Sequence, residues 1–178
     1  MFKAGKVPPE VLKRVALTRV GVRSGRVIVG PAVGEDAAAL RMDGRFLVVN
    51  VDPITAALGR VGWLSVHITA NDVAVCGARP MWYMPTIMLP EGCGEGDLDA
   101  IMGQVDRAAK SIGVTVIGGH TEVSPGVDRP IIVGVMMGEA ERVVKTGDAQ
   151  PGDLLVMTKS AGLEGASIIA SDLRTHLE

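Results

Sequence analysis

The chain is organised around the segment Trp63-Leu-Ser-Val-His-Ile-Thr-Ala-Asn-Asp-Val-Ala-Val-Cys-Gly-Ala-Arg-Pro80. Apolar and small residues occupy most of its circumference, which predicts a helix covered on more than one side. Gly77 and Pro80 are expected to end this helix. The polar pair Asn71-Asp72 interrupts the apolar run, and a buried carboxylate is costly unless it is paired, hydrogen-bonded or bound to a cation. Asp72 therefore either forms a hydrogen bond with a neighbouring element or belongs to a functional site. This segment alone does not distinguish the two interpretations.

Composition limits the classes of protein to which the chain can belong. It has 178 residues, of which 47% are hydrophobic, enough for a substantial core. The formal net charge of -2 offers no general attraction to nucleic acid or to an anionic membrane surface. No apolar run reaches the roughly 20 residues of a membrane span. We expect a cytoplasmic protein without a nucleic-acid or membrane partner.

The remaining pattern alternates strands and helices. A short amphipathic helix is predicted at residues 9–19, after Pro8-Pro9, and a longer one at residues 97–111. Apolar runs bounded by Gly and charged turns predict strands at residues 27–29, 37–40, 46–51, 84–89, 114–117 and 130–137. Asp43-Gly44 predicts a hairpin turn. These elements predict an α/β or α+β fold, a sheet packed by helices.

The last part of the chain has a different character. Residues 146–153 form a turn-rich linker, Leu154–Met157 is expected to be a short strand, and Ser160–Gly165 leads into a helix. A strand, a loop and an unfinished helix do not make a domain. We expect one domain at residues 1–150, followed at 151–178 by a linker and the truncated start of a second domain.

Three acidic residues are expected where a strand gives way to a loop: Asp36, Asp52 and Glu122. Together with Asn71 and Asp72 they offer the hard oxygen ligands that suit Mg²⁺ bound to a polyphosphate, because this ion keeps several waters and takes few carboxylates from protein. The alternative for each one is an ordinary turn residue.

The segment Gly118-Gly119-His120 also has two interpretations. The glycines could let the backbone approach a phosphate or could simply turn the chain. His120 could be a ligand, a phosphate contact or a loop histidine. The two commonest phosphate-binding motifs, Gly-x-x-x-x-Gly-Lys-Ser/Thr and Gly-x-Gly-x-x-Gly, are absent from the sequence.

An ordered series of four motifs carries a resemblance to a known family. The motifs are Gly34–Ala38, Val51–Pro53, Ala70–Ala74 with Gly77–Pro80, and Gly118–Thr121. In this order they resemble the N-terminal half of the aminoimidazole ribonucleotide (AIR) synthase superfamily, or PurM superfamily, over roughly residues 30 to 165. That superfamily includes the hydrogenase maturation protein HypE, thiamine-monophosphate kinase, selenophosphate synthetase and formylglycinamidine ribonucleotide synthetase. The chain is most similar to HypE-like members.

The resemblance implies an architecture and a ligand. It implies an N-terminal α/β domain with a mixed sheet that joins the sheet of a second copy in a barrel, giving a homodimer. It also implies ATP bound with Mg²⁺ along the dimer and domain junction, and a C-terminal α/β domain that begins near the loop at residues 159–164.

Site residues are implied position by position. Asp36, Asp52 and Asp72 match the metal and phosphate carboxylates of the family, and the matching nucleotide positions are Asn71, Gly118, Gly119 and Thr121. His120 and Glu122 occupy the positions expected to be catalytic. The family has Asp, Glu or His at the position of His120, and HypE has Lys at that of Glu122. No Cys precedes Cys76, which argues against selenophosphate synthesis. The acceptor substrate is left open.

The implied reaction is ATP-dependent activation of an oxygen, amide or similar acceptor by phosphoryl transfer. A different class of function is a structural or regulatory module that dimerises and keeps the fold without turnover. The arrangement of the acidic side chains distinguishes the two. Scattered carboxylates, or carboxylates paired with Arg60, Arg79 or Arg129, would favour the module.

Overall fold

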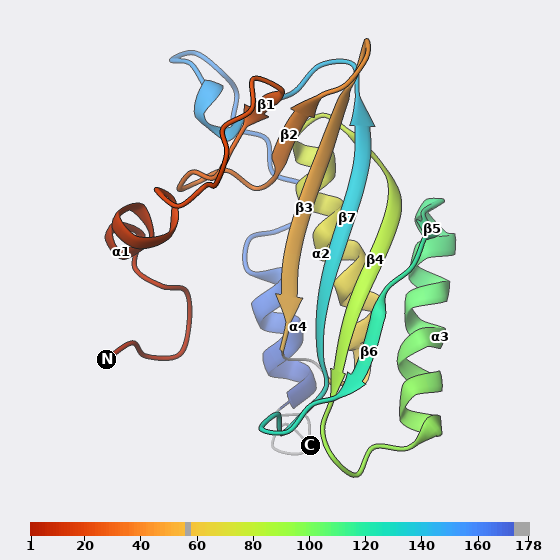
Figure 1. The fold of residues 1–178 in the computed structure, drawn as a ribbon. Coiled ribbons are helices and arrows are strands. Elements are labelled where there is room, and N and C mark those ends of the chain that lie inside the picture. The colour runs from red at the N-terminus through yellow and green to blue at the C-terminus, as the bar shows by residue number, and fades with distance from the viewer. Residues whose placement is uncertain (56–57, 173–178) are drawn as a thin grey trace.

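The computed structural model describes residues 1–55 and 58–172. Its centre is a mixed seven-stranded sheet in which the strands follow the order β1-β2-β3-β7-β4-β5, with β6 also pairing with β4 (Figure 1). The strands are β1 (Val27–Val29), β2 (Ala38–Arg41), β3 (Phe46–Ile54), β4 (Arg79–Leu89), β5 (Thr115–Val116), β6 (His120–Val123) and β7 (Ile131–Ala140).

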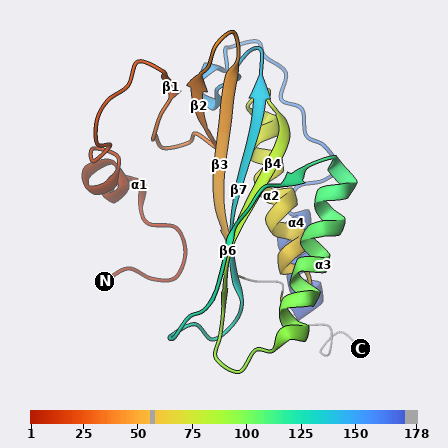
Figure 2. The same cartoon turned by 45° about the vertical axis from the view of Figure 1, so that its right-hand side comes forward.

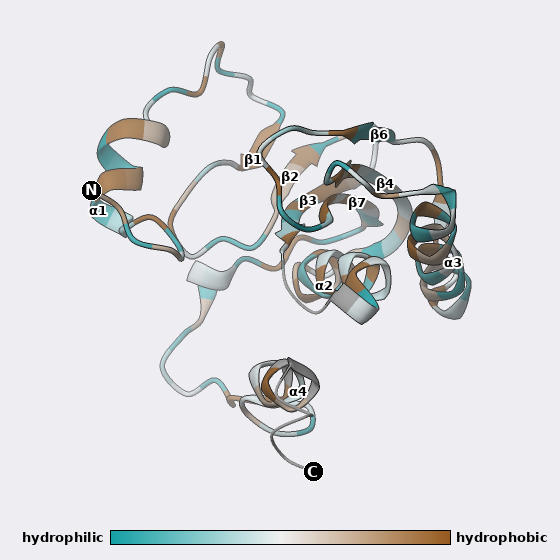
Figure 3. Cartoon of the chain, turned by 90° about the horizontal axis from the view of Figure 1, so that it is seen from below, coloured by the Kyte–Doolittle hydropathy of each residue, from teal (hydrophilic) through white to brown (hydrophobic). Residues whose placement is uncertain are grey.

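Two of the helices pack on one face of this sheet, α2 (Val61–Val75) and α3 (Glu95–Ile112). Figure 3 shows both on the same side of the strands. The other helical segments are α1 (Pro9–Val11), which continues as the π-helical turn η1 (Leu12–Ala16), the 3-10 turns η2 (Leu58–Arg60) and η3 (Thr146–Asp148), and α4 (Leu163–Asp172). No helix in the described part of the chain is both long and apolar enough to cross a membrane.

The antiparallel half of the sheet consists of the β2–β3 hairpin and the long pairing of β3 with β7. The hairpin turn at Asp43-Gly44 is confirmed, because Met42 N donates to Arg45 O over 2.8 Å and Gly44 has the positive φ of 78° that such turns need. β3 then pairs with β7 from Phe46 opposite Ala140 to Ile54 opposite Ile132. This register places Asn50 and Asp52 on the face covered by the helices.

The parallel half is built by a crossover through α3, which Figure 2 shows beside β4 and β6. Ile117 N donates to Tyr83 O over 3.0 Å, and Ser124 N donates to Leu89 O over 2.9 Å, so the chain returns along β4. Between these bonds stands Pro85, which has no N–H to offer on this side of β4. The returning chain is therefore divided into β5 and β6, separated by Gly118-Gly119.

The buried helix predicted from residue 63 is confirmed as α2, but only two of its sides are covered. Val66 and Val73 are fully buried in the core, whereas Val75 is 60% exposed. The hydroxyl of Tyr83 on β4 donates to Ser65 Oγ over 2.7 Å, which fixes the helix against the sheet. The uncovered side of α2 faces away from the sheet.

Three predictions about secondary structure are wrong. β4 begins at Arg79 rather than at residue 84, because the strand continues through Pro80 with a register irregularity before Trp82. His120–Val123 form a strand, since β4 supplies a free edge for them to pair with. Leu154–Met157 do not form a strand: no strand of the described chain pairs with them, and all four side chains are exposed.

Candidate functional site

The amide of Asn50 is the centre of a polar cluster between the sheet and α2. Its Nδ2 donates to the backbone O of Asp36 over 2.8 Å, to Asp72 Oδ2 over 3.0 Å and to Asp52 Oδ2 over 3.2 Å. Asn50 and Asp52 come from β3, Asp72 from α2, and Asp36 from the loop before β2. Residues far apart in sequence are thus brought to one point.

The electrostatics of the cluster are those of like charges held together. Burial, a hydrogen bond with Asp52, and the negative charges of Asp52 and Asp36 together raise the pKa of Asp72 from 3.8 to about 7, while the hydrogen bond from Asn50 opposes the rise. A divalent cation between Asp52 and Asp72 would remove this repulsion.

The three predicted metal ligands are not assembled as one set. Within residues 1–55 and 58–172, no three His, Cys, Asp or Glu side chains converge closely enough to hold a metal ion. Asp52 and Asp72 share the amide of Asn50, but the carboxylate of Asp36 accepts a hydrogen bond from Thr146 Oγ1 over 3.2 Å and is turned aside. The sequence pattern could not reveal this competition from Thr146, which lies 110 positions further along the chain.

The residues present nevertheless fit Mg²⁺. This ion is usually bound through one or two carboxylates together with water and substrate phosphates, and Asp52 and Asp72 supply that number. Asn50 Oδ1 and Glu35 Oε2 are buried oxygens with no hydrogen-bond partner among the described residues. A cavity of about 230 Å³ lined by Glu35, Asp36 and Asn50 opens beside the cluster. Asn71, in contrast, lies on the exposed side of α2.

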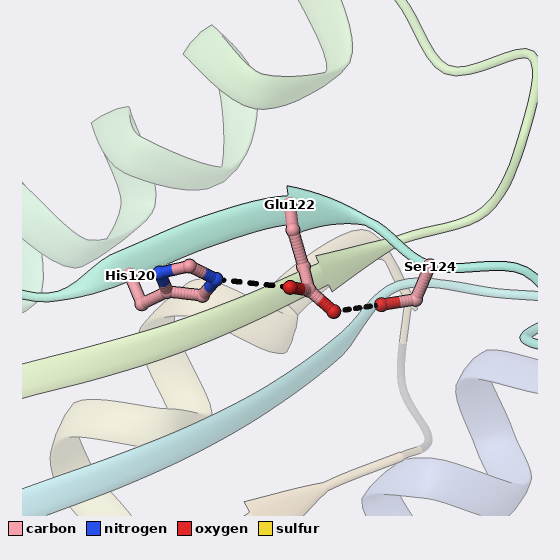
Figure 4. Close-up of polar contacts among 3 residues, drawn as sticks. All are labelled: His120, Glu122 and Ser124. Atoms are coloured by element: carbon pink, nitrogen blue, oxygen red, sulfur yellow. Dashed lines mark hydrogen bonds and ion pairs between the residues drawn. The ribbon is translucent and has the colours of Figure 1, made fainter.

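The predicted catalytic pair forms a second polar group on β6 (Figure 4). His120 Nε2 lies 3.0 Å from Glu122 Oε2, and Ser124 Oγ donates to the other carboxylate oxygen. The bonds from Ser124 and His120 lower the pKa of Glu122, the Ser124 bond having the larger effect. Glu122 therefore stays ionised and fixes the orientation of the imidazole ring.

The two groups lie on opposite faces of the sheet. Asp52 is in register with Gly134, which is in register with Pro85, and these positions face α2. His120 is in register with Thr86, one residue later, and so faces the side without helices. Within one copy of the chain, the sheet therefore separates His120 and Glu122 from the acidic cluster.

The glycines before His120 have a structural role. A Cβ on Gly119 would lie 2.5 Å from Pro85 O, and its φ of 153° is rarely adopted by other residues. Gly119 is thus required for the close approach to β4. Gly118 has open space apart from the sulfur of Met84 at 3.7 Å, and Thr121 is exposed on β6. Among the described residues, no hydrogen bond joins these three residues to the acidic cluster.

Two residues of these groups were missed by sequence reasoning. Asn50 is the one polar residue in the run Phe46–Val51, and a polar side chain in an otherwise apolar strand could have signalled a buried partner. Ser124 carries no such signal, because its contact with Glu122 depends on the chain staying extended beyond the end of β6, where Ser124 N donates to Leu89 O.

The raised pKa of Asp72 predicts how stability depends on pH in metal-free buffer. A carboxyl whose pKa is higher in the folded chain than in the unfolded chain binds more protons when folded, between pH 3.8 and about 7. The free energy of unfolding should therefore fall as pH rises through that window. Urea unfolding at several pH values in the presence of a chelator measures this slope. The slope should be smaller in Asp72→Asn, and an unchanged slope would contradict the assignment.

Comparisons with known proteins identify the family of the chain. A family model described as AIR synthase related protein, N-terminal domain, matches residues 34–140. A protein of Methanocaldococcus jannaschii named for hydrogenase expression and formation is 31% identical over 98% of this chain and 55% of its own length. Other relatives bear the names carbamoyl dehydratase HypE, thiamine-monophosphate kinase and selenide, water dikinase. The chain spans about half the length of the relatives it matches.

Solved structures agree on the fold. HypE in a complex with HypF matches 94% of this chain and 54% of its own, with a TM-score of 0.75 and 25% identity. HypE in complex with ATP matches 59% of this chain and 33% of its own, with a TM-score of 0.51 and 31% identity. The mixed sheet packed by helices is thus the PurM-type fold expected from the sequence. The chain belongs to the AIR synthase related protein family and carries its N-terminal domain at residues 34–140.

Proposed function

We propose that this chain is the N-terminal half of an enzyme that uses ATP and Mg²⁺ to activate an acceptor by phosphoryl transfer. The observation that carries the proposal is the convergence of Asp52 and Asp72 on the amide of Asn50, next to the loop that contains Asp36. A HypE relative has been solved with ATP, and other relatives are named as kinases, which supports the same class of ligand.

The chain's own residues would act mainly through charge and position. Mg²⁺, when bound, offsets the negative charge on the phosphates of ATP. Asp52 and Asp72 would hold the ion, and release of Asp36 from Thr146 would add a third carboxylate. The backbone at Gly118-Gly119 and the side chains of Asn71 and Thr121 are proposed, from the resemblance alone, to contact the nucleotide.

His120 is proposed as the group that takes a proton from the acceptor. When Nε2 donates its hydrogen to Glu122, the lone pair of Nδ1 is left free to accept a proton. Glu122 would stabilise the resulting imidazolium, and Ser124 would hold Glu122 in place. A base of this kind near the acceptor is the usual requirement when a hydroxyl or amide attacks a phosphoryl group.

A second copy of the chain is proposed to cover the open face of the sheet. Val51, Val135 and Met84 are in register across β3, β7 and β4 and form an apolar row. Val51 is 58% exposed and Met84 is 38% exposed, because both point away from the helices. Contiguous apolar surface of this kind usually marks an interface. A homodimer through this face would also place His120 of one copy near the other copy.

The alternative, a module without turnover, is less well supported. It would be favoured by carboxylates scattered over the surface or neutralised by arginines. In the described part of the chain, no ion pair links Asp36, Asp52 or Asp72 to an arginine, and Arg129 pairs instead with Asp128 over 2.9 Å. Two half-buried carboxylates held together without a cationic partner are costly in a protein that has no use for them.

The proposal is tested by calorimetric titration of ATP into this chain with and without Mg²⁺, at a concentration where light scattering has established the oligomer. Metal-dependent binding to a dimer is the expected result. Absence of binding to this chain and also to a chain extended to the length of its relatives would refute the proposal. Binding only to the longer chain would mean that the second domain completes the site.

A further inference from the structure

Asn50 is a buried polar residue to which the proposed reaction assigns no role of its own. It is 5% exposed, in the middle of an apolar strand and in front of α2. Burying an amide in such a place is costly unless its hydrogen bonds are made. Its donor side is fully engaged, while its Oδ1 has no partner within the described residues.

The contacts of Asn50 fix the orientation of its amide. All three groups around Nδ2 are acceptors: the carbonyl of Asp36 at 2.8 Å, Asp72 Oδ2 at 3.0 Å and Asp52 Oδ2 at 3.2 Å. An amide nitrogen has two hydrogens, so three acceptors compete for them. Turning the amide over would place Oδ1 against the same three oxygens, which is unfavourable.

Without this amide, the oxygens of Asp52 and Asp72 would face each other with no positive group between them. Two carboxylates that share one hydrogen-bond donor are close enough to repel each other, and without the donor one of them would rotate away or take up a proton. The partially positive Nδ2 hydrogens thus occupy the place that a cation would take between two anionic ligands. The same amide ties the loop carrying Asp36 to β3.

We propose that Asn50 is a positioning residue that holds Asp52 and Asp72 as a ready pair of ligands before a divalent cation arrives. This inference rests on the proposed metal-dependent function and adds to it the residue that prepares the site. When the cation binds, it takes over the neutralisation of the carboxylates, and Nδ2 keeps its bond to the carbonyl of Asp36.

The test compares Asn50→Leu with Asp106→Leu in the 178-residue chain, with Mn²⁺ as the probe and electron paramagnetic resonance counting the free ion. Leu has the same branched arrangement of four side-chain heavy atoms as Asn and Asp, is larger in volume, and donates no hydrogen bond. Asp106 is exposed on α3 and pairs with Lys110 over 2.7 Å, so it is a control for the change from a polar side chain to Leu. We expect Asn50→Leu to weaken Mn²⁺ binding by about 10- to 100-fold, as loss of groups that orient metal ligands does. Asp106→Leu should bind Mn²⁺ as the unchanged chain does.

A second variant separates positioning from a purely structural role. Asn50→Asp keeps the size of the side chain but replaces the donor with a carboxylate. We expect its thermal midpoint in chelator to fall, because three carboxylates then meet, and to recover when Mn²⁺ is added. A residue needed only for packing would give a loss of stability that Mn²⁺ does not reverse. If Asn50→Leu does not fold, this reversal in Asn50→Asp decides the question.

The outcomes also distinguish this inference from the proposed function. Tight Mn²⁺ binding by the unchanged chain and equally tight binding by Asn50→Leu would overturn the role of Asn50 and leave the metal site standing. No Mn²⁺ binding, with or without ATP, by the unchanged chain and also by a chain extended to the length of its relatives would overturn both. Weakened binding in Asn50→Leu alone, with reversal in Asn50→Asp, supports both.

Discussion

Replacing Asp72 with Asn is expected to abolish the Mg²⁺-dependent binding of ATP while leaving the fold intact. The substitution keeps the size of the side chain but removes the charge that would balance the cation, and it leaves one oxygen instead of two to accept the bond from Asn50. Loss of a direct ligand should cost more than the roughly 100-fold at the upper end for residues that only orient ligands. Calorimetric titration with and without Mg²⁺ measures the loss.

The matched control is Asp106→Asn, another Asp-to-Asn change on a helix. Asp106 is exposed on α3 and pairs with Lys110 over 2.7 Å, so its loss should affect binding little. Circular dichroism of both variants checks the fold. If Asp72→Asn kept its metal-dependent affinity, the carboxylate pair would not be the metal site.

A second large effect is expected from Gly138→Ala, on stability rather than on binding. A Cβ on Gly138 would lie 2.4 Å from the backbone O of Arg79 and 2.7 Å from Val73 Cγ1. The oxygen belongs to the paired strand β4 and cannot rotate away, so β4 and α2 would both have to move. Overpacking of a core costs about 1–3 kcal/mol, and we expect the upper end or more here. For a chain of this length, about 3 kcal/mol lowers the thermal midpoint by roughly 6–12 °C.

Gly103→Ala provides the control with the opposite sign. Gly103 lies on α3, where the nearest atom to a new Cβ is the flexible end of Arg107 at 3.3 Å. Replacing a helical Gly with Ala stabilises by about 0.5–1 kcal/mol, because the unfolded chain loses conformational freedom. Thermal unfolding of the two variants side by side should give shifts in opposite directions. A small shift for Gly138→Ala would mean that the strands at this point are less tightly packed than described.

The parts of the fold that could be predicted from sequence are those whose residues carry their own pattern. α3 has an apolar stripe, and β3 and β7 have long apolar runs, so each was expected within a few residues of its bounds. β6 has no such pattern, because all four of its side chains are exposed. It exists because β4 offers a free edge, and a pairing partner is not visible in a local stretch of sequence.

The candidate site shows the same division. The nearness of Asp52 and Asp72 was expected from the order of the motifs, and the shared bonds to Asn50 agree with it. Which face of the sheet His120 occupies could not be expected, because it depends on the pairing register with Thr86, and a shift by one residue reverses it. The Thr146 bond to Asp36 also depends on long-range packing.

The position of His120 and the acidic cluster on opposite faces has a consequence for enzyme kinetics. In the proposed homodimer, a ligand that touches both groups would touch two chains, so the number of complete sites would follow the concentration of paired chains. The specific activity proposed for the enzyme should then decline on dilution below the dissociation constant of the proposed dimer, whereas Mn²⁺ binding at Asp52 and Asp72 should not. Two variants, each defective on one face, should complement each other when mixed, because the mixed pair contains one site in which both faces are intact.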